Sequence, residues 1–105
     1  MDVLLRIKRL VIQGQVRFTV KAKEDMKVCD LESIEVMEAI INATSIAKVL
    51  RSRSPNRSHA TEKLYVIKGL SYQGTAIYTK SKIDQEEGRE VFYILISAKL
   101  DRASD

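Results

Sequence analysis

Hydrophobic residues recur at helical spacing near the start of the chain. They occupy every third or fourth position, at Val3, Leu4, Ile7, Leu10 and Val11. This spacing predicts an amphipathic helix that begins after Asp2 and ends before Gly14. Basic residues lie between the apolar ones, so we expect a helix that packs on the core with a solvated basic side. A basic amphipathic helix lying on a membrane is the alternative.

The following segment combines two patterns. Residues 16–20 read VRFTV and alternate as an extended piece does, whereas the next residues favour a helix, which we predict over about Val20–Val28. We expect Asp30 to cap a third helix that ends at Asn42. Acidic residues lie in its first half, where the helix dipole favours them. Its predicted apolar face consists of Leu31, Ile34, Val36, Met37, Ile40 and Ile41.

From Ser45 onward the hydrophobic pattern changes to a period of two. Polar turns separate four stretches rich in β-branched and aromatic residues: SIAKVLRSRS, EKLYVIKGLS, TAIYTKSKI and REVFYILISAKL. Such stretches predict consecutive antiparallel strands, and the last, apolar on both faces, belongs inside the sheet. The predicted fold is therefore α+β, with N-terminal helices packed on a four-stranded antiparallel sheet. We expect a single domain over residues 1–105, with a frayed tail at 101–105.

The composition limits the kinds of cofactor and setting that we expect for this chain. The 105 residues are 45% hydrophobic and 30% charged, as in an ordinary globular domain. A single cysteine, Cys29, cannot form an internal disulfide, which favours a reducing, cytoplasmic setting. We expect no signal peptide and no membrane span, because basic residues interrupt the apolar runs. With one histidine and one cysteine the usual zinc ligand sets cannot form, and no phosphate-binding glycine motif is present, so we expect no metal or cofactor.

Positive charge is concentrated in the middle of the chain, and the formal net charge is +4. Between residues 48 and 68, Glu62 is the single acid among the basic residues Lys48, Arg51, Arg53, Arg57, Lys63 and Lys68. Alternation places Arg51 and Arg53 on one strand face, where they can contact successive phosphates of a nucleic acid. Four tyrosines near this sheet can stack on bases or donate hydrogen bonds: Tyr65, Tyr72, Tyr78 and Tyr93. The alternative is a solvated basic face with tyrosines in the core.

The order of these elements on a basic chain resembles the RelE-like ribonuclease toxins of bacterial toxin–antitoxin pairs, and among them the MqsR-type and BrnT-like branches. Residues 6–26, RIKRLVIQGQVRFTVKAKEDM, are similar to the opening of those families: a helix that ends near a glycine, a short extended piece, and a second helix. The resemblance spans roughly residues 4–100. It implies a cytoplasmic mRNA endoribonuclease, acting on or off the ribosome, that is held by a cognate antitoxin protein.

The resemblance also implies site residues. By position, the catalytic lysine of the MqsR-type branch falls on Arg51, its tyrosine on Tyr78 and its last lysine on Lys99. A glutamine of that site falls on or near Glu62, an acid in place of an amide. The His-Ala pair of the BrnT-like relatives corresponds to Lys21–Ala22. The residues implied as contacts to RNA phosphates are Arg53, Arg57, His59 and Lys63.

The implied reaction is metal-independent. The ribose 2′-OH attacks its adjacent phosphate and leaves a cyclic phosphate or 3′-phosphate and a 5′-OH end. This needs a base, cations for the phosphorane, and an acid for the leaving oxygen. Lys99 and Arg51 suit the charge, if folding brings them together, whereas the base is open among Glu62, Tyr78 and His59. Two alternatives use no catalysis: a nucleic-acid-binding module on the same sheet, and a protein-interaction domain whose acidic helix meets a basic partner.

Overall fold

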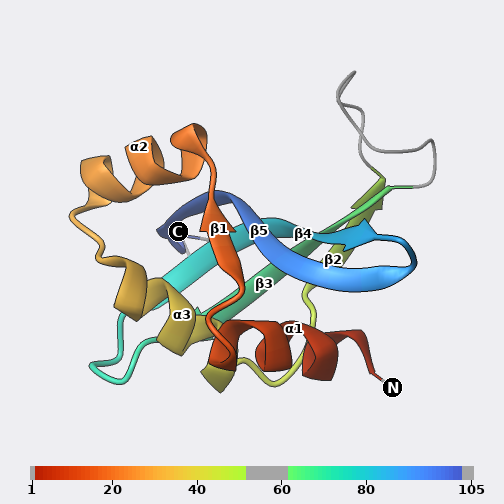
Figure 1. Cartoon of the computed structure of the whole chain (residues 1–105). Coiled ribbons are helices and arrows are strands. Elements are labelled where there is room, and N and C mark those ends of the chain that lie inside the picture. Colours follow the sequence, from red (N-terminus) through yellow and green to blue (C-terminus); the bar gives the residue numbers. More distant parts are fainter. Residues whose placement is uncertain (1, 52–61, 103–105) are drawn as a thin grey trace.

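The computed structural model describes residues 2–51 and 62–102. Within these residues, helices and strands alternate at first, and long strands follow (Figure 1). The elements in chain order are α1 (Val3–Ile12), β1 (Val16–Phe18), α2 (Val20–Cys29), α3 (Ser33–Asn42), β2 (Lys48–Arg51), β3 (Lys63–Leu70), β4 (Ala76–Glu86) and β5 (Arg89–Leu100).

The strands form one mixed sheet in the order β1-β5-β4-β3-β2. The α+β class is confirmed, but the prediction of a four-stranded antiparallel sheet is wrong, because β1 joins as a fifth strand parallel to β5. Three residues are enough for this pairing, since Val16 and Phe18 also pack against the core. The last strand lies between β1 and β4, which confirms its predicted interior place.

The helix boundaries follow local capping. The helix α1 begins after Asp2 as predicted, and Asp2 caps it, its Oδ1 accepting from the Leu4 N–H at 3.0 Å. Asp30 does not cap α3; it ends α2 in the left-handed conformation, with φ of 55°. Glu32 caps α3 instead, in a reciprocal capping box with Glu35. An aspartate tolerates the left-handed conformation better than most residues, which explains its place at the turn.

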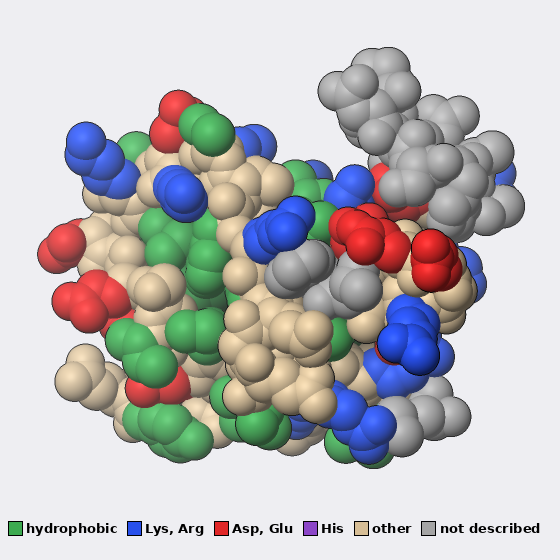
Figure 2. All heavy atoms as spheres, viewed as in Figure 1, with side chains coloured by type: hydrophobic (Ala, Val, Ile, Leu, Met, Phe, Trp, Pro, Cys, Tyr) green, Lys and Arg blue, Asp and Glu red, His purple; other side chains and the backbone are tan. Residues whose placement is uncertain are grey.

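The core lies between the helices and one face of the sheet. From the helices it receives Leu4, Ile7, Leu10, Val11, Ala22, Met26, Val36, Ala39 and Ile40, and from the strands Ile67, Ile77, Tyr93, Leu95 and Ala98. The predicted face of α3 is largely right, but Ile34 is 52% exposed. Hydrophobic side chains are visible at the surface between α2 and α3 (Figure 2).

Two basic side chains of α1 contact other elements of the fold. Lys8 Nζ donates to the Ala43 carbonyl at 2.6 Å, which satisfies an acceptor just after α3. Arg6 Nε lies 3.0 Å from Glu90 Oε2 on β5. The predicted solvated side of this helix is therefore partly engaged in packing the domain together.

Candidate functional site

Five lysines lie on the sheet face opposite the core. Residues directly opposite on neighbouring strands share a face, and Tyr78 of β4 pairs with Lys68 of β3 and with Lys99 of β5. The register also places the remaining three lysines on this face. Lys80 and Lys82 alternate with the buried Thr79 and Ser81, and Lys48 pairs with Val66, which lies opposite Lys80. We call this surface the lysine face and define it by Lys48, Lys68, Lys80, Lys82 and Lys99.

Tyr78 lies between two ammonium groups. Lys99 Nζ is 5.4 Å from the centroid of the Tyr78 ring, within the range of a cation–π interaction. On the other side lies Lys68, whose Nζ is 3.8 Å from Asp101 Oδ1. Lys68 and Lys99 are exposed and Tyr78 is half-buried. This row, which we call the Lys68–Tyr78–Lys99 row, offers two cations and a phenol to an anion approaching from solvent.

Arg51 lies far from this row. It pairs with Lys63, and Lys63 and Lys68 are five positions apart on β3, roughly 16 Å along the strand. Since an odd separation reverses the side-chain direction, Arg51 also starts from the face opposite Lys99. The structure therefore brings together Tyr78 and Lys99, but it does not add Arg51 to them.

Glu62 also lies at the far end of the sheet, and it is 6% exposed. Its Oε2 is 3.4 Å from Nζ of Lys82, so the carboxylate accepts from a lysine of the lysine face. Lys63 is exposed at the same end and, with Arg6 and Glu90, lines a small pocket there. Of the predicted phosphate contacts, Arg53, Arg57 and His59 lie outside the described residues.

The four tyrosines have different surroundings. Burial raises the pKa of Tyr93, which is fully buried in the core and stays protonated. Tyr65 packs against the core from its edge. Tyr72 is exposed in the turn after β3, where its N–H donates to Glu38 Oε1 at 3.0 Å. Of the four, Tyr78 is the one that the register places on the lysine face.

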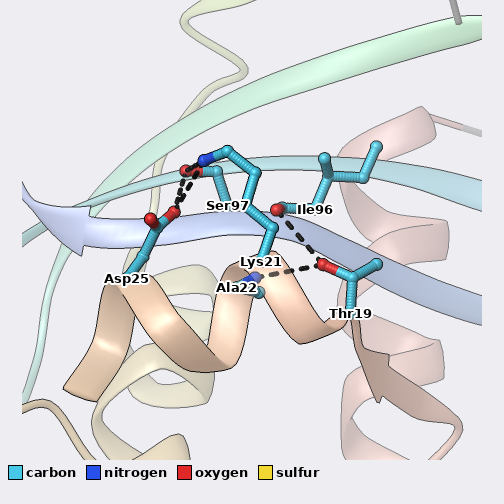
Figure 3. A network of polar contacts seen from close by, with 6 residues as sticks. All are labelled: Thr19, Lys21, Ala22, Asp25, Ile96 and Ser97. Carbon is cyan, nitrogen blue, oxygen red and sulfur yellow. Dashed lines mark hydrogen bonds and ion pairs between the residues drawn. The ribbon is translucent and has the colours of Figure 1, made fainter. Parts of the chain in front are cut away.

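A polar cluster holds α2 beside β5 (Figure 3). Asp25 Oδ2 accepts from Ser97 Oγ at 2.6 Å and from Lys21 Nζ at 3.0 Å. Burial alone would raise the pKa of Asp25, but the hydrogen bonds from Ser97 and Lys21 and the charges of Lys21 and Lys99 lower it. The Asp25 carboxylate is therefore ionised at neutral pH, and its hydrogen bonds hold α2 against β5, the strand that carries Lys99.

The sequence prediction missed this cluster, although two signals pointed to it. Lys21 and Asp25 are four positions apart on one helix, the spacing of an intrahelical ion pair. Ser97 is a polar residue within the apolar run of residues 91–98, and it is 2% exposed. Lys21 also occupies the position matched to the histidine of the BrnT-like relatives, and its Nζ is 3.5 Å from Ser97 Oγ.

One side of the molecule has mixed surface charge. On the side seen in Figure 2, acidic side chains lie among the basic ones. In residues 2–51 and 62–102, no three His, Cys, Asp or Glu side chains are grouped so as to hold a metal ion. In the same residues, no helix has the length and apolar character needed to cross a membrane.

Comparison with known proteins adds no relative. No family model matches the chain, and no curated protein or solved structure matches it. The functional argument therefore depends on the residues described above.

Proposed function

We propose that the chain binds single-stranded RNA on the lysine face and cleaves it without a metal ion, as the toxin of a toxin–antitoxin pair. The observation that carries the proposal is the Lys68–Tyr78–Lys99 row. Ammonium groups spaced over a sheet face match the repeated phosphates of a nucleic acid. An aromatic ring among them offers a stacking surface or a hydroxyl, both of which single-stranded RNA can use.

The row supplies two of the functions that the reaction needs. The 2′-oxygen bonds to phosphorus while the bond to the 5′-oxygen breaks, and negative charge accumulates on the non-bridging oxygens. Lys68 and Lys99 stabilise this charge. Tyr78 donates a proton to the leaving 5′-oxygen and regains one from solvent, while the 2′-OH proton passes to water. The internal nucleophile is why RNA, rather than DNA, is the proposed substrate.

A test with purified protein measures cleavage directly. Single-stranded RNA is incubated with the chain in the presence of a chelator, and the new ends are mapped. We expect fragments with 5′-OH ends and a rate that falls on the order of 100-fold in Lys99→Ala and in Tyr78→Phe. The matched control is Lys23→Ala, which removes a lysine from the exposed side of α2. Full cleavage by both row variants would contradict the proposed site.

The second candidate is a nucleic-acid-binding module without catalysis. The separation of Arg51 and Glu62 from Tyr78 and Lys99 favours it, because the row by itself contains no evident base. It predicts RNA binding that weakens with salt and gives no new ends. Induction in a bacterial host distinguishes the two: growth arrest with new 5′-OH ends, relieved by Lys99→Ala, supports the toxin, and normal growth with soluble protein supports the module.

The antitoxin belongs to the same proposal. A partner that silences this chain has to cover a basic sheet face, so an acidic protein encoded beside it is expected. Co-expression of that protein should restore growth and block RNA binding by the purified chain. Failure of an adjacent acidic protein to bind the chain would count against the toxin–antitoxin part of the proposal.

A further inference from the structure

A pocket of about 450 Å³ adjoins the Lys68–Tyr78–Lys99 row at the end of β5. This size lies within the range of pockets that hold small ligands. It lies where α2 ends and the chain leaves the sheet, so its walls come from a helix end, three strands and the following tail. Residues distant in sequence therefore meet around one space.

The pocket contains groups of both signs. Lys68, Lys99 and Arg102 are cations at its wall, and Asp101 is the carboxylate among them. Asp101 is held in place through its backbone, because its N–H donates to the Ala76 carbonyl at 3.0 Å. A simple phosphate would need only the cations. A ligand with a phosphate and a hydrogen-bond donor would use the carboxylate as well.

The rest of the wall is apolar. Leu100 and Tyr78 also line the pocket, and Cys29 lines it at the end of α2. A flat, partly apolar ring can pack against such a wall, as nucleobases do on aromatic and aliphatic side chains. A base that is paired within a duplex is stacked between neighbours and cannot enter.

From these features we propose that the pocket binds one unpaired nucleotide of the RNA chain. The phosphate lies on Lys68, Lys99 and Arg102, a ribose hydroxyl or base amino group donates to Asp101, and the base packs on Leu100. The inference rests on the proposed function and deepens it: the substrate is single-stranded at the reacting position, and the pocket selects the nucleotide beside it.

The single cysteine makes the pocket directly testable. Cys29 is the chain's one thiol and is partly exposed in the pocket wall, so its alkylation by iodoacetamide reports occupancy. We expect adenosine monophosphate to slow this alkylation, as measured by mass spectrometry, while the same concentration of inorganic phosphate has little effect. Lys99→Ala should raise the nucleotide concentration needed about tenfold. The matched control, Lys23→Ala, should leave it unchanged.

Each result has a defined meaning. If the chain binds or cleaves RNA but neither the nucleotide nor a short single strand protects Cys29, the pocket proposal is wrong and the proposed function still stands. Protection of Cys29 without cleavage supports the pocket and contradicts the catalytic part of the proposed function. Equal protection by inorganic phosphate would contradict nucleotide binding and would indicate a site for simple anions instead. Asp101→Asn should change the order of preference among the four nucleoside monophosphates, and an unchanged order overturns the contact to Asp101.

Discussion

Asp25 shows how one side chain connects the fold to the site. Its carboxylate accepts from Ser97 on β5 and from Lys21 one turn earlier on α2, and it lies in the field of Lys99. The side chain is 22% exposed, so solvent screens these interactions only in part. The same contacts that lower its pKa also hold α2 against the strand that carries Lys99.

Replacing Asp25 by asparagine should lower stability in a pH-dependent way. The pKa of Asp25 in the folded chain lies below its ordinary value of 3.8, so ionisation favours the folded state. We expect Asp25→Asn to lower the free energy of unfolding by about 1 kcal/mol at neutral pH, allowing for screening. The difference from the natural chain should shrink as the pH falls below 3.8 and through the lowered pKa, where both side chains are neutral.

Urea unfolding at a series of pH values measures this effect. Asp30→Asn is the matched control, because it makes the same chemical change at an exposed residue in the left-handed conformation, which asparagine also adopts. A constant difference for Asp25→Asn across the whole series would mean that the charge of Asp25 contributes nothing to stability.

At the scale of elements, α3 and β3 approach each other closely at Gly69. A Cβ built on Gly69 would lie 1.9 Å from the Ala39 carbonyl oxygen, far inside contact distance. Gly69 is therefore needed for space rather than for a special backbone angle. Its absent side chain lets the helix backbone lie directly on the strand, which packs Ala39 and Ile40 into the core.

Gly69→Ala should therefore destabilise the chain strongly. We expect a loss of about 3 kcal/mol in the free energy of unfolding, because helix and strand backbones have to separate. Gly74→Ala is the control: Gly74 has φ of +88° and open space around it, so strain alone should cost about 1 kcal/mol. Chemical denaturation of both variants measures the difference, and equal losses would show that the close approach of α3 is not required.

At the scale of the whole molecule, charge position matters more than net charge. The formal net charge of +4 is modest, and acidic and basic side chains are interspersed on the side seen in Figure 2. The register nevertheless gathers five lysines on one sheet face, from strands that are consecutive in the sheet. An RNA strand lying there would release counterions in proportion to the phosphates it pairs.

The salt dependence of RNA binding tests this surface. Lys80→Ala, in the middle of the lysine face, should weaken binding and reduce the slope of log affinity against log salt by about 0.7, the value of one phosphate contact on a single strand. Fluorescence anisotropy with a labelled oligonucleotide at several salt concentrations gives the slope. Lys23→Ala should leave the slope unchanged, and an equal change in both variants would mean that binding is spread over the molecule.

Much of the fold could be predicted from the sequence, because hydrophobic period and capping are local. The bounds of α1 and α2 and the end of α3 at Asn42 agree with their patterns. The fifth strand could not be predicted as such, since three residues carry little periodicity and β1 pairs with residues 93–95, far along the chain. Asp30 was misassigned because aspartate suits both a helix start and a left-handed turn.

The candidate site divides in the same way. Tyr78 and Lys99 were named together on the basis of the family resemblance, and their pairing across β4 and β5 places them side by side. Arg51 was grouped with them, but the distance along β3 and the opposite face separate it. Ser97 and Asp25 were missed, because their contact joins residues 72 positions apart.

By itself, the sequence determined which segments are helical or extended and the α+β class. It also determined which basic and aromatic residues the chain carries. Those properties follow from neighbours a few positions away, where spacing and propensity act. Strand order, register and the meeting of α2 with β5 were decided by the tertiary structure alone. They depend on burying all apolar faces at once, and it is this long-range condition that assembles the Lys68–Tyr78–Lys99 row and its pocket.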